Sequence, residues 1–146
     1  GGGFPLGACL MTEACAAPMQ PGSHGSTYGG NPLAMAVGNA VWDIIADDAF
    51  LAEVRRVSGT LAQGLKSLAD SHPEKVEALT GKGLLTGLKL KADPKGLQAL
   101  CREGGLLAGV AGNNVLRLAP PLIITDTEAR EAINIIDAAL TEWELG

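Results

Sequence analysis

The feature that most constrains the fold is the alternation of short apolar runs with turn residues after position 75. Four runs have the length and composition of strands, and they cover residues 76–79, 84–90, 106–110 and 115–119. Gly81-Lys82-Gly83 separates the first two runs, and Gly112-Asn113-Asn114 separates the last two. Glycine and asparagine at such places favour tight turns, so two β-hairpins are predicted.

Helix signals lie between the two hairpins and after them. Asp93-Pro94 starts one helix and Gly104-Gly105 ends it, since Asp and Pro favour helix starts and Gly favours helix ends. Thr125, with Glu128 three residues later, forms a capping box for a last helix that runs to about Trp143. The second half of the chain therefore predicts the order β-β-α-β-β-α.

Two helices are expected before the hairpins. Asn31-Pro32 starts the first, over about 33–46, because Asn is a good N-cap and Pro fits the first helical position. The second covers about 49–69, where apolar residues recur at intervals of three and four in an amphipathic stripe. Pro73 prevents its continuation.

The first 47 residues differ in character from the rest. Residues 1–30 are rich in glycine and proline and hold one apolar run, Leu6–Leu10, which predicts a buried strand. We place a domain boundary near Asp47. Residues 1–47 are predicted to belong to a larger domain, and residues 48–146 to form a small α+β domain.

The amino-acid composition limits the kinds of molecule that the protein is expected to bind. The formal net charge of −5 disfavours nucleic acid and anionic membranes, which require clustered Lys and Arg, and favours a small soluble metabolite. The three cysteines lack metal-ligand spacing and favour a reducing, cytoplasmic compartment, and no metal is expected. No apolar run is long enough to span a bilayer. The start at Gly1, without a methionine, predicts a fragment of a longer protein.

The segment 24–32, His-Gly-Ser-Thr-Tyr-Gly-Gly-Asn-Pro, is a candidate anion site. Small residues let backbone amides approach a ligand, and the hydroxyls of Ser26 and Thr27 can donate to oxygen. The following helix points its positive end at the loop, which suits a phosphate. The alternative is that these residues form only a flexible loop followed by an N-capped helix, with no ligand site.

Arg117 is the second candidate, because it lies among apolar residues on a predicted strand. An isolated buried charge is costly, so the guanidinium must be paired or face a cleft. Its planar fork suits a carboxylate ligand, while a structural salt bridge to an acidic side chain is the alternative.

Four strings resemble class III aminotransferases in order and spacing, with acetylornithine aminotransferases the most similar of the class. They are GGGFPLGACLMT, PGSHGSTYGGNPLA, GKGLLTGLKL and NNVLRLAPPLIIT. The resemblance covers essentially the whole chain. It implies an α/β fold, that of the fold-type I pyridoxal-phosphate transferases, with the end of the large domain followed by the small C-terminal α+β domain.

The resemblance also implies roles for the candidate residues. Ser26 and Thr27 match a Ser-Thr pair whose threonine binds the pyridoxal-phosphate phosphate of the neighbouring subunit in a homodimer. Arg117 matches the arginine that binds the substrate α-carboxylate. In the family, the lysine that holds the cofactor lies a few residues before the GGGFP string. This chain begins at Gly1 without that lysine, so the chain alone is expected to be inactive.

The implied reaction transfers the amino group of N-acetylornithine or ornithine to 2-oxoglutarate, in arginine biosynthesis. Another ω-amino-acid transaminase, of the 4-aminobutyrate type, keeps the chemistry and changes the substrate. A non-catalytic assembly or anion-binding module is the alternative from another class.

Overall fold

A computed structural model describes residues 1–145 of the chain. These residues divide into two units, 1–51 and 52–145, which are described separately. The helix α3 (Asp48–Ser71) continues across the division between them.

The first unit contains a single turn of helix, α1 (Glu13–Ala16), and the longer α2 (Pro32–Ile45). The predicted start of α2 is confirmed: Asn31 is the N-cap, its Oδ1 accepts the Ala34 N–H at 2.9 Å, and Pro32 is the first helical residue. The helix therefore follows directly on the glycine-rich loop.

The first unit has almost no interior of its own. Ala34 is the one buried residue in the range 1–51. Large apolar side chains remain open to solvent, among them Leu10, Tyr28 and Trp42, which are 91%, 82% and 65% exposed. Such exposure is unfavourable, because transfer of apolar surface into water costs free energy.

The buried strand predicted at Leu6–Leu10 is wrong for this structure. The run forms no strand, and residues 7–10 are exposed. A strand needs a neighbour to take up its N–H and C=O groups, and every strand in the described part of the chain lies between residues 76 and 118. An apolar sequence alone does not supply that neighbour.

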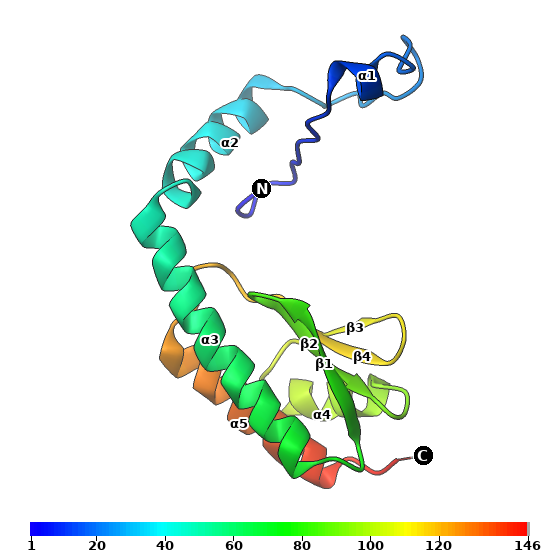
Figure 1. Ribbon diagram of the computed structural model, residues 1–146, viewed down its shortest axis with the longest axis vertical. Coiled ribbons are helices and arrows are strands. Elements are labelled where there is room, and N and C mark those ends of the chain that lie inside the picture. The colour runs from blue at the N-terminus through cyan, green and yellow to red at the C-terminus, as the bar shows by residue number, and fades with distance from the viewer. Residues whose placement is uncertain (146) are drawn as a thin grey trace. The chain divides into compact units, whose positions relative to one another are not determined.

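The second unit confirms the predicted order β-β-α-β-β-α after α3. Its further elements are β1 (Val76–Lys82), β2 (Leu85–Leu90), α4 (Lys95–Glu103), β3 (Gly109–Ala111), β4 (Val115–Leu118) and α5 (Asp126–Glu142). Figure 1 shows α3 and α5 side by side. The Thr60–Asp126 hydrogen bond joins the two helices, and His72, directly after α3, is hydrogen-bonded to Asp137 on α5.

The four strands form one antiparallel sheet in the order β1-β2-β4-β3. Leu88 pairs with Leu116 and Thr86 with Leu118, so these residues share one face of the sheet. That face and the three helices enclose the core: Leu61, Leu65, Leu68, Val76, Leu84, Leu88, Leu90, Leu97, Cys101, Leu116, Leu118, Ile136, Ala139, Leu140 and Trp143. The amphipathic stripe predicted for the long helix supplies three of them.

Most predicted turns and caps are confirmed, with small shifts. Asn113 and Asn114 have φ of 61° and 59°, the sign that a type I′ hairpin turn requires at both central residues. Thr125 and Glu128 form the capping box. The α4 prediction is one residue early: Pro94 is the N-cap, and the Asp93 carboxylate accepts the Lys95 N–H instead.

The strand ends also differ from the prediction. β1 continues to Lys82, so the first hairpin turns at residues 83–84, and β3 begins only at Gly109. Among the helices of residues 1–145, none is both long and apolar enough to cross a bilayer.

Candidate active site

Arg117 lies on the sheet face that points away from the core. Its neighbours in β4, Leu116 and Leu118, are buried, whereas Arg117 is exposed. Side chains alternate along a strand, so burial of the two leucines directs the arginine to the opposite, open face. An arginine between buried leucines is therefore accommodated without burying its charge.

A pocket of about 460 Å³ lies on this open face and is lined by residues of both hairpins. It is lined by Thr80, Gly81, Leu85, Thr86, Lys89, Ala111, Gly112, Asn113, Val115 and Arg117. Of the two expectations for Arg117, the structure supports the cleft and not the salt bridge. Within residues 1–145 its guanidinium makes no hydrogen bond or ion pair.

The second cation in the pocket, Lys89, is already paired. Its Nζ donates to Glu77 Oε1 at 2.6 Å, across the β1–β2 hairpin. Arg117 is thus the cation of this pocket whose donors are available to a ligand. A planar group with two acceptor oxygens, such as a carboxylate, matches its fork.

The residues beside Arg117 in the sheet are glycines. Arg117 pairs with Gly87 on β2 and with Gly109 on β3, and Gly87 pairs in turn with Thr80 on β1. The row across the four strands therefore reads Thr80, Gly87, Arg117, Gly109. The arginine has no side chain next to it on either neighbouring strand.

These two glycines were not among the residues singled out from the sequence. A glycine inside a strand often marks a place where another group approaches the backbone closely. Gly87, within the run 84–90, could have been recognised from the sequence on this basis. Their placement on either side of Arg117 depends on strand register, and the sequence does not show register directly.

The other candidate residues, Ser26 and Thr27, lie in a turn of the first unit. Gly29 N–H donates to the Ser26 carbonyl at 3.3 Å, and Asn31 Nδ2 donates to the Tyr28 carbonyl at 2.8 Å. Both hydroxyl side chains are exposed, and neither has a hydrogen-bond partner within residues 1–145. The turn thus holds two free hydroxyls just before the N-terminus of α2, where an anion is favoured.

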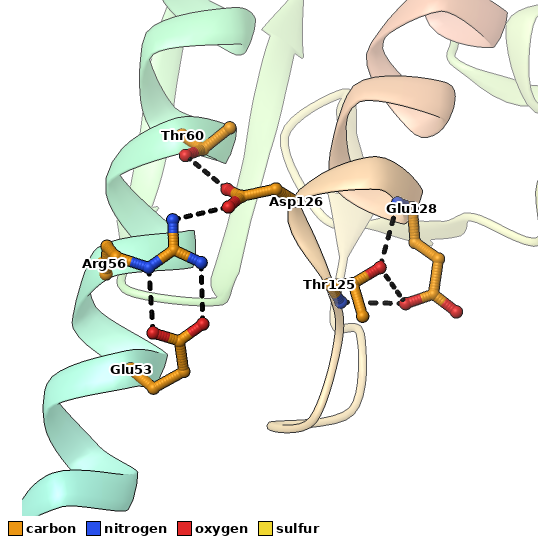
Figure 2. A network of polar contacts seen from close by, with 6 residues as sticks. All are labelled: Glu53, Arg56, Thr60, Thr125, Asp126 and Glu128. Atoms are coloured by element: carbon orange, nitrogen blue, oxygen red, sulfur yellow. Dashed lines mark hydrogen bonds and ion pairs between the residues drawn. The ribbon is translucent and has the colours of Figure 1, made fainter.

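A separate polar network fastens the start of α5 to α3 (Figure 2). Asp126 accepts from Thr60 Oγ1 at 2.7 Å and from Arg56, which also forms an ion pair with Glu53. The hydrogen bond from Thr60 and the charge of Arg56 lower the pKa of Asp126 below its ordinary value. These residues line no part of the Arg117 pocket, and their contacts join α5 to α3.

Cys101 belongs to the core and not to a site. Burial raises the pKa of its thiol to about 11, so it stays protonated and unreactive at neutral pH. No group of three His, Cys, Asp or Glu side chains that could hold a metal ion occurs within residues 1–145.

Comparison with known proteins identifies the family. The model of the aminotransferase class-III family matches residues 1–140. The chain is 51% identical over 138 residues to the acetylornithine aminotransferase of Mesorhizobium japonicum, and 52% identical over 139 residues to that of Agrobacterium fabrum. These alignments cover 94% and 95% of this chain but 35% of each relative.

Solved structures agree with the sequence comparison. The acetylornithine aminotransferase of Elizabethkingia anophelis has a TM-score of 0.73 at 32% identity, covering 85% of this chain and 32% of that one. The ornithine δ-aminotransferase of Plasmodium falciparum has a TM-score of 0.76 at 28% identity, and the match covers 90% of this chain and 35% of that one. The predicted α/β aminotransferase fold is confirmed. The chain belongs to the aminotransferase class-III family.

Proposed function

We propose that this chain is part of a pyridoxal-phosphate-dependent aminotransferase that transfers the amino group of N-acetylornithine, or ornithine, to 2-oxoglutarate in arginine biosynthesis. The names of the relatives at 51% and 52% identity support the acetylornithine substrate. Because the chain spans 35% of their length, the activity is proposed for the complete protein that contains it.

The observation that carries the proposal is the guanidinium of Arg117, which has no partner among the described residues and lies on an open, glycine-flanked sheet face. Every amino acid and oxo acid in such a reaction carries an α-carboxylate. A bidentate ion pair with Arg117 would hold that group and thereby fix the direction of the reacting amine or carbonyl carbon.

The loop before α2 fits the phosphate end of the cofactor. Ser26 and Thr27 offer hydroxyl donors without partners among the described residues, and the helix N-terminus adds a favourable field for a dianion. When bound, pyridoxal phosphate would supply the electron sink that amino transfer requires. Thr27 would bind its phosphate across the interface of a homodimer.

The assignment of residues 1–47 to the end of a larger domain, and of residues 48–146 to the small domain, is part of the same proposal. The exposed apolar side chains of the first unit favour it, because residues 1–51 bury only Ala34 among themselves. A homodimer would cover such surface. We place the complete enzyme in the cytoplasm, with small-molecule substrates.

The function is tested on the complete protein, loaded with pyridoxal phosphate, by steady-state assays with N-acetylornithine, ornithine and 4-aminobutyrate as amino donors. We expect the highest kcat/KM with N-acetylornithine. A preference for 4-aminobutyrate would replace the substrate assignment, and no amino transfer with any donor would overturn the function.

The role of Arg117 has its own test. Loss of one partner of a charged hydrogen-bonded pair costs about 2–5 kcal/mol, so Arg117→Ala is expected to raise KM for glutamate roughly 30-fold or more. Arg117→Lys keeps the positive charge but not the two parallel N–H donors, so its KM for glutamate should lie between that of the unmodified protein and that of Arg117→Ala. Arg130→Ala, which removes an exposed arginine on α5, is the control. Unchanged KM in Arg117→Ala would rule out the carboxylate role.

A further inference from the structure

We propose that Gly109 is a positioning residue for Arg117. The absence of a side chain at this position leaves one edge of the guanidinium uncovered, so that a substrate carboxylate can bind it with two hydrogen bonds. The inference rests on the proposed role of Arg117 in carboxylate binding.

The geometry around Gly109 points to this role. Gly109 on β3 lies opposite Arg117 on β4 in the antiparallel register. A Cβ added at Gly109 would lie 3.3 Å from Arg117 Nη2, 3.4 Å from Nε and 3.7 Å from Cζ. Nε and Nη2 are the two nitrogens on one edge of the guanidinium, and this edge can donate to both oxygens of one carboxylate.

The backbone does not explain the glycine. The φ angle of Gly109 lies outside the left-handed region, so an L-residue can adopt the same conformation. Glycine inside a strand is unfavourable, because it loses more backbone entropy on folding and has no side chain to pack. Its presence on this short strand therefore requires another reason, and the guanidinium contact supplies one.

Gly87, the other neighbour of Arg117, differs in this respect. A Cβ at Gly87 would lie 2.4 Å from the Leu116 carbonyl oxygen and 2.9 Å from Val115 Cγ1, so tight packing of β2 against β4 already excludes a side chain there. At Gly109 the three nearest atoms all belong to the Arg117 guanidinium. Gly109 is thus the position where a side chain would disturb the arginine and leave the sheet intact.

Two consequences follow for the bound ligand. A methyl group at position 109 requires the guanidinium to move by a few tenths of an ångström, while the branched side chain of valine would cover the Nε–Nη2 edge or displace it. In either case one of the two hydrogen bonds to a carboxylate is weakened or lost, but the arginine charge remains.

The test compares Gly109→Ala and Gly109→Val in the complete, cofactor-loaded protein. We expect Gly109→Val to raise KM for glutamate about tenfold, the loss expected for one charge-assisted hydrogen bond, with a much smaller change in kcat. Gly109→Ala should have a smaller effect in the same direction. Thermal unfolding of each variant shows whether the sheet is preserved; if the valine variant does not fold, the alanine variant decides the test.

The control is Gly59→Ala, on α3, because Gly59 lines no part of the Arg117 pocket. A Cβ there meets nothing within 4 Å, so KM for glutamate should not change. A second comparison places Gly109→Val in the Arg117→Ala background, where it should add little, because the edge that it covers is already absent.

The outcomes separate the two proposals. If Arg117→Ala leaves KM unchanged, the carboxylate role fails and this inference fails with it. If Arg117→Ala raises KM strongly while Gly109→Val does not, only the inference about Gly109 is overturned. The inference is also overturned if Gly109→Val raises KM to the same extent with and without Arg117.

Discussion

At the scale of single residues, Arg117 and Thr27 are available for different physical reasons. Arg117 is exposed because strand alternation places it opposite two buried leucines, so the sheet itself orients it. Thr27 is exposed because it lies in a short turn that makes its hydrogen bonds through the backbone. The backbone at Arg117 is paired with a strand on each side, whereas the backbone at Thr27 lies in a turn closed by local hydrogen bonds.

The proposed role of Thr27 predicts weaker retention of the cofactor in Thr27→Ala. Loss of a hydrogen bond to a charged phosphate corresponds to a decrease in affinity of about tenfold or more. Thr27→Ser keeps a hydroxyl and should retain most of the cofactor affinity. Thr127→Ala, on the exposed face of α5, should leave the cofactor affinity unchanged. The affinity is measured by titrating the cofactor-free protein with pyridoxal phosphate and recording the absorbance of the cofactor. Equal affinity in Thr27→Ala and the unmodified protein would remove Thr27 from the phosphate site.

At the scale of elements, the sequence predicts helix starts more accurately than strand ends. Asn31 and Thr125 cap α2 and α5 as expected, because a capping bond depends on residues only three positions apart. Strand ends depend on a partner elsewhere in the chain. β3 begins at Gly109 and not at 106, and the run Leu6–Leu10 forms no strand at all.

The α3–α5 contact through Asp126 predicts a pH dependence of stability. Its pKa in the folded chain is lowered, first by the Thr60 hydrogen bond and then by Arg56. The contact therefore stabilises the fold above the ordinary carboxyl pKa of about 4, and this stabilisation is lost as the pH falls through the folded-state pKa.

We expect Asp126→Asn to lower Tm at pH 7, and the difference from the unmodified chain to shrink as the pH falls below about 4. Thermal unfolding of the 146-residue chain between neutral and acid pH measures it. Glu131→Gln removes an exposed acid on the same helix and is the control. A difference in Tm that stays constant down to the acid limit would contradict the assignment.

At the scale of the whole molecule, the two units differ in how they are stabilised. The second unit has a continuous core that joins the sheet to three helices. The first unit buries Ala34 alone and exposes several of its larger apolar side chains, among them Leu10, Tyr28 and Trp42. Since burial of apolar surface is the main source of stability, the second unit should account for most of the stability of this chain.

This difference predicts the pattern of amide hydrogen exchange in the 146-residue chain. Amides in β2, β4 and α5 should exchange about a thousandfold or more slowly than unprotected amides, while those in residues 1–31 should exchange at nearly unprotected rates. In the complete protein, contacts with the rest of the enzyme should protect the first unit as well. Equal protection of both units in the 146-residue chain would contradict the prediction.

The sequence by itself determined the order of elements in the second unit, the caps of α2 and α5, and the family. These depend on neighbouring residues or on long motifs that need no three-dimensional context. It also indicated Ser26, Thr27 and Arg117 as candidates. Tertiary structure decided which glycines border Arg117. It also decided that, among residues 1–145, Lys89 is paired while Arg117 is not, and Leu6–Leu10 has no strand partner. These facts depend on strand register and on contacts between distant residues, because a strand completes its hydrogen bonds only with a neighbour supplied by the fold.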